Sequence, residues 1–219
     1  MSHTTAFRKV LSAALTLGLL WGLADPAASE SPPGEPAASP PGPAARRVVE
    51  SFHAVLVDGM KRSAELGFAG RQQQIAESLD ETFDIPAIAR DAILRGWKRL
   101  SEPDRARWVA LVRQYWASRY AHEYRSFSGQ SFETLDAAPA TDEVVVVDTR
   151  FHQPGGSDVA LEYRLLEVDG AWRVGDFHVG GKGSEVRRLR DSNYVVLEHG
   201  GFEALVADLN QQIEQLQRE

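Results

Sequence analysis

The stretch DVALEYRLLEVDGAWRVGDF, residues 158–177, predicts a β-hairpin with one buried face. Apolar and mainly polar residues alternate along its first arm, as expected for a strand between core and solvent. The apolar face consists of Val159, Leu161, Tyr163 and Leu165. Asp169-Gly170 is a strong signal for a tight hairpin turn. This pattern leaves open whether the protein's own helices cover the apolar face or whether it lines a pocket for a ligand.

The hairpin is part of a predicted antiparallel sheet of four strands. Residues 131–136, 143–152, 159–168 and 171–179 have strand character, with turn residues at Pro154-Gly155-Gly156. The run Val144–Val147 does not alternate, which predicts a strand covered on both faces. In the last strand Trp172 and Val174 are at even-numbered positions, whereas Phe177 and Val179 are at odd-numbered positions. This change in alternation predicts a β-bulge near Gly175.

Helical periodicity precedes and follows the four strands. The spacing predicts helices over the stripe from Val48 to Met60, around Ile75 and Leu79, after a cap at Asp84, and from Ser101 to about Phe127. After Gly183 a basic helical piece leads into an amphipathic stripe from Phe202 to Leu216. We therefore expect an α+β fold: a helical N-terminal half, a curved four-stranded antiparallel sheet, and C-terminal helices packing back on the sheet.

The first 45 residues predict export and a tether. Residues 1–24 have a short basic region followed by an uncharged apolar run that ends in small residues, the layout of a secretory signal peptide. Residues 25–45 are rich in Pro and Ala and predict a disordered linker. The folded domain is expected over residues 46–219. We therefore expect an exported protein, and the absence of cysteine suits either redox compartment.

Composition and motifs argue against several function classes. Cleavage after Ala24 would remove two cations and no anion and lower the formal charge from −7 to −9, so we expect no nucleic-acid partner. The Gly-rich segment after Asp176 lacks the residues of a phosphate-binding loop, and no pattern of an acyl-enzyme nucleophile or metal site occurs. We expect no cofactor, no metal and no enzymatic activity. Asp148 or Asp176 beside an apolar sheet face keeps an enzyme as an alternative.

Several short motifs in fixed order resemble the MlaC family, also called the toluene-tolerance auxiliary proteins. The resemblance runs from about Val48 to the end of the chain. It is carried by Phe83-Asp84-Ile85, Trp97 before Ser101–Arg105, Tyr120, Ser128-Gly129, Gln153–Gly156, Tyr163-Arg164-Leu165 and Asp169–Val174 with Asp176. Leu94 and Gly96 depart from the family pattern, and residues 120–132 and 184–194 resemble a hopanoid-associated branch.

The resemblance implies a periplasmic carrier that holds phospholipid acyl chains between helices and a curved sheet. It also implies two kinds of partner: an inner-membrane ABC transporter with an MCE-domain protein, and an outer-membrane lipoprotein complex. A hopanoid is the second expectation for the cargo. The direction of transport does not follow from the sequence.

On this hypothesis two layers part enough to form a long, continuous apolar cavity. The expected lipid-binding walls are the hairpin residues Val159, Leu161, Tyr163, Leu165 and Trp172 and the helical residues Phe52, Leu56, Trp108, Leu111, Val112 and Tyr115. A non-catalytic adaptor is the other alternative, and it predicts a filled core with an exposed apolar patch.

Overall fold

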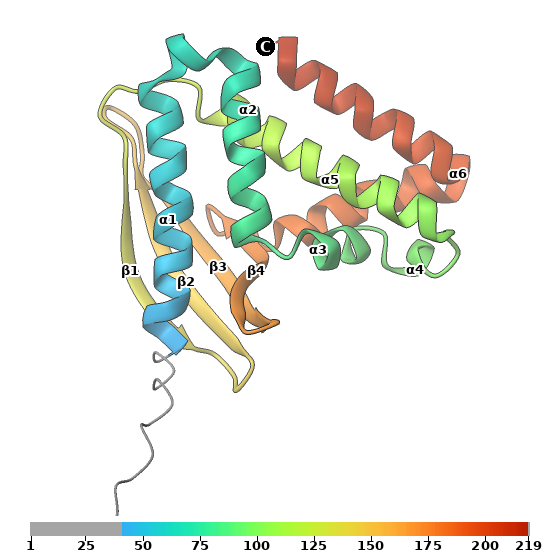
Figure 1. Cartoon of the computed structure of the whole chain (residues 1–219), viewed down its shortest axis with the longest axis horizontal. Helices are drawn as coiled ribbons and strands as arrows, with labels where there is room; N and C mark the ends of the chain where they lie inside the picture. Colours follow the sequence, from blue (N-terminus) through green and yellow to red (C-terminus); the bar gives the residue numbers. More distant parts are fainter. Residues whose placement is uncertain (1–40, 219) are drawn as a thin grey trace, which may run out of the picture. The chain divides into compact units, whose positions relative to one another are not determined.

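The computed structural model describes residues 41–218, which form six helices and one four-stranded sheet (Figure 1). In chain order the elements are α1 (Pro41–Lys61), α2 (Ser63–Thr82), α3 (Ile85–Asp91), α4 (Leu94–Trp97), α5 (Glu102–Glu123), β1 (Ser131–Pro139), β2 (Val144–His152), β3 (Val159–Val168), β4 (Ala171–Val179) and α6 (Glu185–Arg218). Helices before and after one antiparallel sheet confirm the α+β prediction. The proposed signal peptide and residues 25–40 lie outside the described part of the chain.

Helix α1 begins earlier than the sequence predicted. It starts at Pro41, five residues before the expected domain start, and Ala45 is fully buried. A close contact with β1 explains the burial, because a Cβ placed on Gly42 would lie 2.5 Å from the carbonyl oxygen of Ala137. Residues 41–45 therefore belong to the domain, and the predicted linker is too long at its C-terminal end.

Predicted capping residues begin α3 and α5. The Asp84 carboxylate accepts a hydrogen bond from the Ala87 amide, and the Ser101 hydroxyl accepts one from the Asp104 amide. Helix α5 ends at Glu123, earlier than the predicted end near Phe127. The short helix α4 was not predicted, and α2 is longer than expected from its two apolar markers.

The strands follow in the order β1-β2-β3-β4, each antiparallel to its neighbour. In the β3–β4 hairpin both Asp169 and Gly170 have positive φ, as a tight two-residue turn requires. The register shifts so that Gly175 is left between two paired residues, which confirms the predicted bulge. A second bulge at Leu135 in β1 was not predicted.

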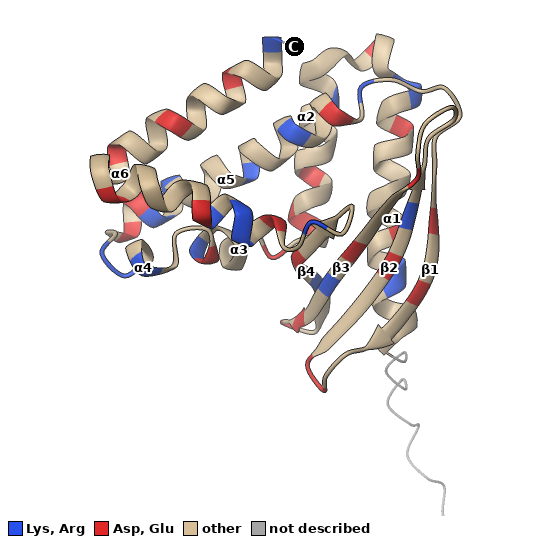
Figure 2. Cartoon of the chain, turned by 180° about the vertical axis from the view of Figure 1, so that it is seen from behind, with Lys and Arg blue, Asp and Glu red and all other residues tan. Residues whose placement is uncertain are grey.

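Only one face of the sheet is covered. Helix α1 crosses this inner face and contacts β1, β2 and β4, while charged residues occupy the opposite, outer face (Figures 1 and 2). In β2, Val145 and Val147 are buried but Val144 and Val146 are half-exposed. The prediction that this strand is covered on both faces is therefore wrong.

Helix α6 packs along α5 and contacts β4. It bends at Gly201, where φ is +71°, so its two halves match the two predicted C-terminal pieces. The buried stripe of the second half consists of Leu205, Val206, Leu209 and Ile213. No helix within residues 41–218 combines the length and the apolar character needed to cross a membrane.

Candidate functional site

The inner face of the sheet is buried against aromatic side chains. We call this set the aromatic cluster; its members are Phe52, His53, Phe83, Trp116, Tyr120, Tyr124, Phe132, Phe151, Tyr163 and Phe177. They come from α1, α2's C-terminal end, α5 and all four strands. The apolar face of the β3–β4 hairpin is therefore covered by the protein's own helices.

Helix α5 contributes three rings at a spacing of four residues. Trp116 and Tyr120 lie on α5, and Tyr124 is the residue directly after its end, with its amide hydrogen-bonded to the Tyr120 carbonyl. The Trp116 ring centroid lies 5.0 Å from that of Phe177 on β4, and the Tyr124 ring lies 5.2 Å from that of Phe151 on β2. These edge-to-face contacts join α5 to the sheet.

The contact between the two layers is almost closed. Where α5 meets β3 and β4, a cavity of only about 30 Å³ remains. It is lined by Trp116, Arg119, Tyr120, Glu123, Tyr124, Leu161, Tyr163, Phe177 and Val179. Pockets that hold a ligand of moderate size typically measure roughly 300–1,000 Å³. The expected long apolar cavity is therefore not formed at this interface in the described chain, and the packed interior matches the adaptor alternative's expectation here.

The polar groups of the cluster are uncharged. Burial lowers the pKa of His53 to about 3 and raises the pKa of Tyr120 and Tyr163 well above the ordinary tyrosine value. His53 Nε2 and the Tyr163 hydroxyl share a hydrogen bond of 3.0 Å. The Trp116 Nε1 donor is buried without a partner among the described residues. The interior thus offers apolar rings and three buried polar atoms without a partner among the described residues: Trp116 Nε1, His53 Nδ1 and Thr149 Oγ1 on β2.

Charged residues lie where the cavity meets solvent. The Arg119 guanidinium lies over the Trp116 ring at 5.4 Å, and its Nε donates to the Glu123 carboxylate at 2.9 Å. On its other side Arg119 Nη1 lies 3.4 Å from the carboxylate of Glu185, which is 1% exposed and also pairs with Arg188. The charged residues that line the cavity are therefore one arginine and one glutamate, Arg119 and Glu123, which pair with each other.

The structure brings five of the predicted wall residues to the sheet's inner side. Phe52 belongs to the aromatic cluster, Leu56 is buried on the same helix, and Leu161, Tyr163 and Leu165 are buried on β3. Val159 is half-buried at the start of β3.

The other predicted wall residues lie elsewhere. Trp108 donates from Nε1 to the Ala89 carbonyl at 2.8 Å and contacts the Phe202 ring, so it faces α3 and α6. Trp172 lines a separate surface pocket with residues at the start of α1. Leu111, Val112 and Tyr115 are buried in the middle of α5, and the Tyr115 ring lies 5.2 Å from the ring of Trp116.

Sequence reasoning omitted Trp116, Tyr120, Tyr124 and Phe177 from the site. The four-residue spacing of the three helical aromatics is the signal that could have found them. The parity of Phe177 depends on the Gly175 bulge, which reverses the face of every later residue in β4.

Neither of the two aspartates considered for catalysis, Asp148 and Asp176, lines the cavity beside α5. Asp148 is exposed on the outer face of the sheet. One oxygen of Asp176 accepts hydrogen bonds from the Phe177 amide and the Ser184 hydroxyl, which fixes the turn between β4 and α6. Within residues 41–218, His, Asp and Glu side chains form no group suited to hold a metal ion.

The sequence pattern of the MlaC protein family matches residues 48–211. The chain belongs to the MlaC family. None of the curated proteins matches the chain significantly in sequence. A solved structure of a phospholipid-binding protein from Ralstonia solanacearum, in complex with a phospholipid, is similar to this MlaC-family chain with a TM-score of 0.70 and 19% identity. The match covers 81% of this chain and 99% of the Ralstonia chain, and at this identity it shows a shared fold.

A second solved structure matches the chain more weakly. It is a domain of unknown function with a cystatin-like fold from Nostoc punctiforme, with a TM-score of 0.30 and 15% identity. The match covers 78% of this chain and 98% of the Nostoc chain.

Proposed function

We propose that this MlaC-family protein is a periplasmic lipid carrier that holds phospholipid acyl chains between α5 and the inner face of the sheet. The observation that carries the proposal is the aromatic interface itself. Ring edges join α5 to the sheet, so the layers can separate by rotating and displacing side chains while every strand pairing is kept. The family membership and the shared fold with a phospholipid-binding protein support this assignment.

The chemistry of the interface suits a two-tailed lipid. Such a lipid exposes roughly thirty methylenes in water, each costing about 0.8 kcal/mol, so unaided transfer is opposed by something on the order of 20 kcal/mol. Separated layers would offer the tails apolar rings, offer an ester carbonyl the free Trp116 Nε1 donor, and offer a phosphate the guanidinium of Arg119.

The closed interface implies that loading requires opening. A ligand stabilises the open state only to the extent that it binds that state more tightly than the closed one. We propose that docking to an MCE-type ABC transporter of the inner membrane and to an outer-membrane lipoprotein complex favours the open state. In this scheme the two membrane complexes, more than the lipid's affinity for the free carrier, determine loading and release. A hopanoid is the second candidate cargo.

Extraction of lipid from the natively purified protein tests the carrier function. Mass spectrometry of the organic extract should detect about one phospholipid per chain, and a hopanoid in its place would change the cargo. Protein that carries no lipid, and takes none from phospholipid vesicles, would favour the adaptor alternative.

A matched pair of variants tests the location of the lipid. Leu161→Trp fills the cavity and should lower the lipid content several-fold, whereas Leu135→Trp, on the exposed bulge of β1, should leave it unchanged. Equal lipid content in both variants, with unchanged unfolding temperature, would exclude this interface as the lipid site.

A further inference from the structure

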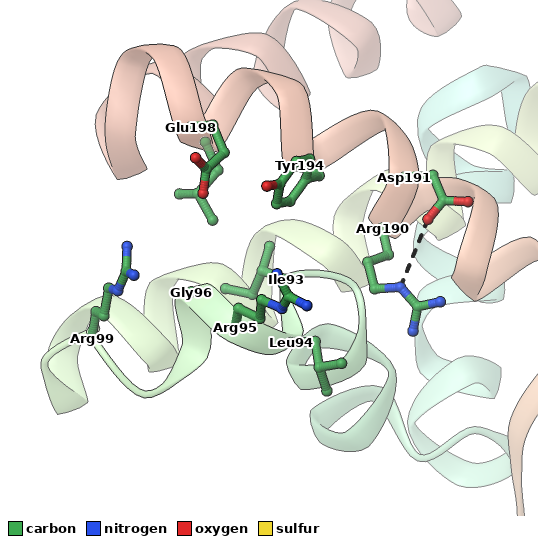
Figure 3. A pocket seen from close by; sticks show the side chains of 10 residues that line it. Ile93, Leu94, Arg95, Gly96, Arg99, Arg190, Asp191, Tyr194 and Glu198 are labelled. Atoms are coloured by element: carbon green, nitrogen blue, oxygen red, sulfur yellow. Dashed lines mark ion pairs between the residues drawn. The ribbon is translucent and has the colours of Figure 1, made fainter.

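A second pocket lies between α4 and the first half of α6, away from the aromatic cluster. Its volume is about 340 Å³, and Figure 3 shows its side chains. Ile93 and Leu94 contribute apolar surface from the α4 side, and Tyr194 and Leu197 from α6. The helices approach closely here, because a Cβ on Gly96 would overlap the Leu197 side chain.

Exposed apolar side chains gather at this pocket. Leu94 is 50% exposed, Tyr194 48% and Val195 58%, and these are the highest values among the large apolar residues of the described chain. Leu94 and Tyr194 line the pocket, and Val195 is the next residue on α6. Apolar and aromatic side chains of this kind, held at a surface rich in arginine, are typical of membrane-interface contacts.

The charges around the pocket differ in sign from those of the whole chain. Residues 90–99 contain four cations and one anion, although the formal charge of the chain is −7. Figure 2 shows basic residues around α3 and α4. Arg95 and Arg99, which line the pocket, form no ion pair within residues 41–218. Two carboxylates also line the pocket, those of Asp191 and Glu198. The Oδ1 atom of Asp191 lies 3.8 Å from the Nε atom of Arg190.

We propose that this pocket and its rim form a docking site for an anionic lipid surface. Arg95 and Arg99 would pair with lipid phosphates, while Leu94 and Tyr194 enter the interface between head groups and acyl chains. An anionic bilayer attracts each nearby arginine and would orient this otherwise acidic protein with α4 toward the membrane. The proposal concerns a different surface from the aromatic cluster and does not require that the cluster binds lipid.

Vesicle flotation with the full chain tests the proposal. The probes are vesicles of phosphatidylcholine alone and vesicles that also contain phosphatidylglycerol. The parent protein should float with the anionic vesicles, bind the neutral ones much more weakly, and dissociate as salt is raised. Any contribution of residues 1–40 is common to the parent and all variants.

Three variants locate the contact. Arg95→Gln with Arg99→Gln should lower partitioning onto anionic vesicles roughly thirtyfold, and Leu94→Ser about tenfold. Arg150→Gln, on the outer face of the sheet, removes an exposed cation elsewhere and should change partitioning less than about twofold. Because the altered side chains are at the surface, unfolding temperatures should stay close to that of the parent.

Several outcomes would overturn the proposal. These are equal binding to neutral and anionic vesicles, an Arg150→Gln effect as large as that of the double variant, or no vesicle binding by the parent. Lipid extracted from the same preparations reports separately on the aromatic cluster. Variants that no longer float but retain extracted lipid would support the docking site, and failure of either proposal would be visible without the other.

Discussion

The His53 imidazole on α1 and the Tyr163 hydroxyl on β3 share a hydrogen bond of 3.0 Å in the buried interior. His53 also stacks on Phe132 with ring centroids 4.0 Å apart, and its Nδ1 has no partner among the described residues. The pair joins the first helix to the central hairpin through a group that can titrate. A protonated imidazole here would be a buried cation without a counterion.

This burial predicts that the protein loses stability below pH 6.5. The unfolded chain protonates His53 near pH 6.5, but in the folded state burial lowers the His53 pKa to about 3. Between these values the unfolded state binds more protons, so the free energy of unfolding falls as the pH falls, by about 1.4 kcal/mol per pH unit at the steepest. His53→Gln removes this titration, and urea unfolding at a series of pH values should show a smaller slope. Parallel curves for the parent and the variant would contradict the prediction.

The approach of α1 to β1 predicts opposite effects for two glycines of one helix. Gly42→Ala places a methyl group against the Ala137 backbone carbonyl, which cannot move aside, and should cost about 1–3 kcal/mol of stability despite the better helix propensity of alanine. At Gly59 the nearest atom to an added Cβ lies 3.8 Å away, so Gly59→Ala should be neutral or stabilise by up to about 1 kcal/mol. Thermal or urea unfolding measures both. A stabilising Gly42→Ala would show that α1 does not approach β1 so closely.

Arg119 pairs with a buried glutamate, Glu185, and an exposed one, Glu123, and we expect the loss of each carboxylate to lower the free energy of unfolding by a different amount. Glu185→Gln removes the buried carboxylate between Arg119 and Arg188 and should lower the free energy of unfolding by about 1–3 kcal/mol. Glu123 is 48% exposed at its side chain, and Glu123→Gln should cost less than about 1 kcal/mol. Raising the salt concentration should reduce the Glu123 effect more than the Glu185 effect. Equal costs with equal salt dependence would contradict the burial of Glu185.

The acidic row on the outer sheet face predicts a stabilising substitution. Asp148 is paired in register with Asp136 on β1 and Glu162 on β3, and partial burial, with the charges of Glu162 and Asp136, raises its pKa. The ionised carboxylate of Asp148 is therefore less stable in the folded protein than in the unfolded chain, and it lowers the free energy of unfolding at neutral pH. Asp148→Asn should raise the free energy of unfolding at neutral pH by about 0.5 kcal/mol. The gain should shrink in high salt and as the pH falls through the Asp148 pKa.

Asp142→Asn in the β1–β2 connection is the control for this prediction, because it removes an exposed carboxylate away from the row. The same stability gain in both variants would assign the effect to net charge and not to the cross-strand contacts.

Local sequence patterns determined several elements and turns of this fold. Alternation set the inner face of β3, Asp169-Gly170 set its turn, side-chain caps at Asp84 and Ser101 set two helix starts, and the parity slip revealed the Gly175 bulge. Each of these signals depends on residues within a few positions of one another, so the sequence by itself contains them.

Only the tertiary structure shows which helices and strands pack against one another. Trp108 and Trp116 lie on the same helix, α5, yet Trp108 faces α3 and α6 while Trp116 faces the sheet. Periodicity identifies an apolar stripe but not its partner, because the partner depends on how distant segments pack. For the same reason the sequence predicted an open apolar slot, and only the packing of rings from α1, α5 and the strands closed it to about 30 Å³.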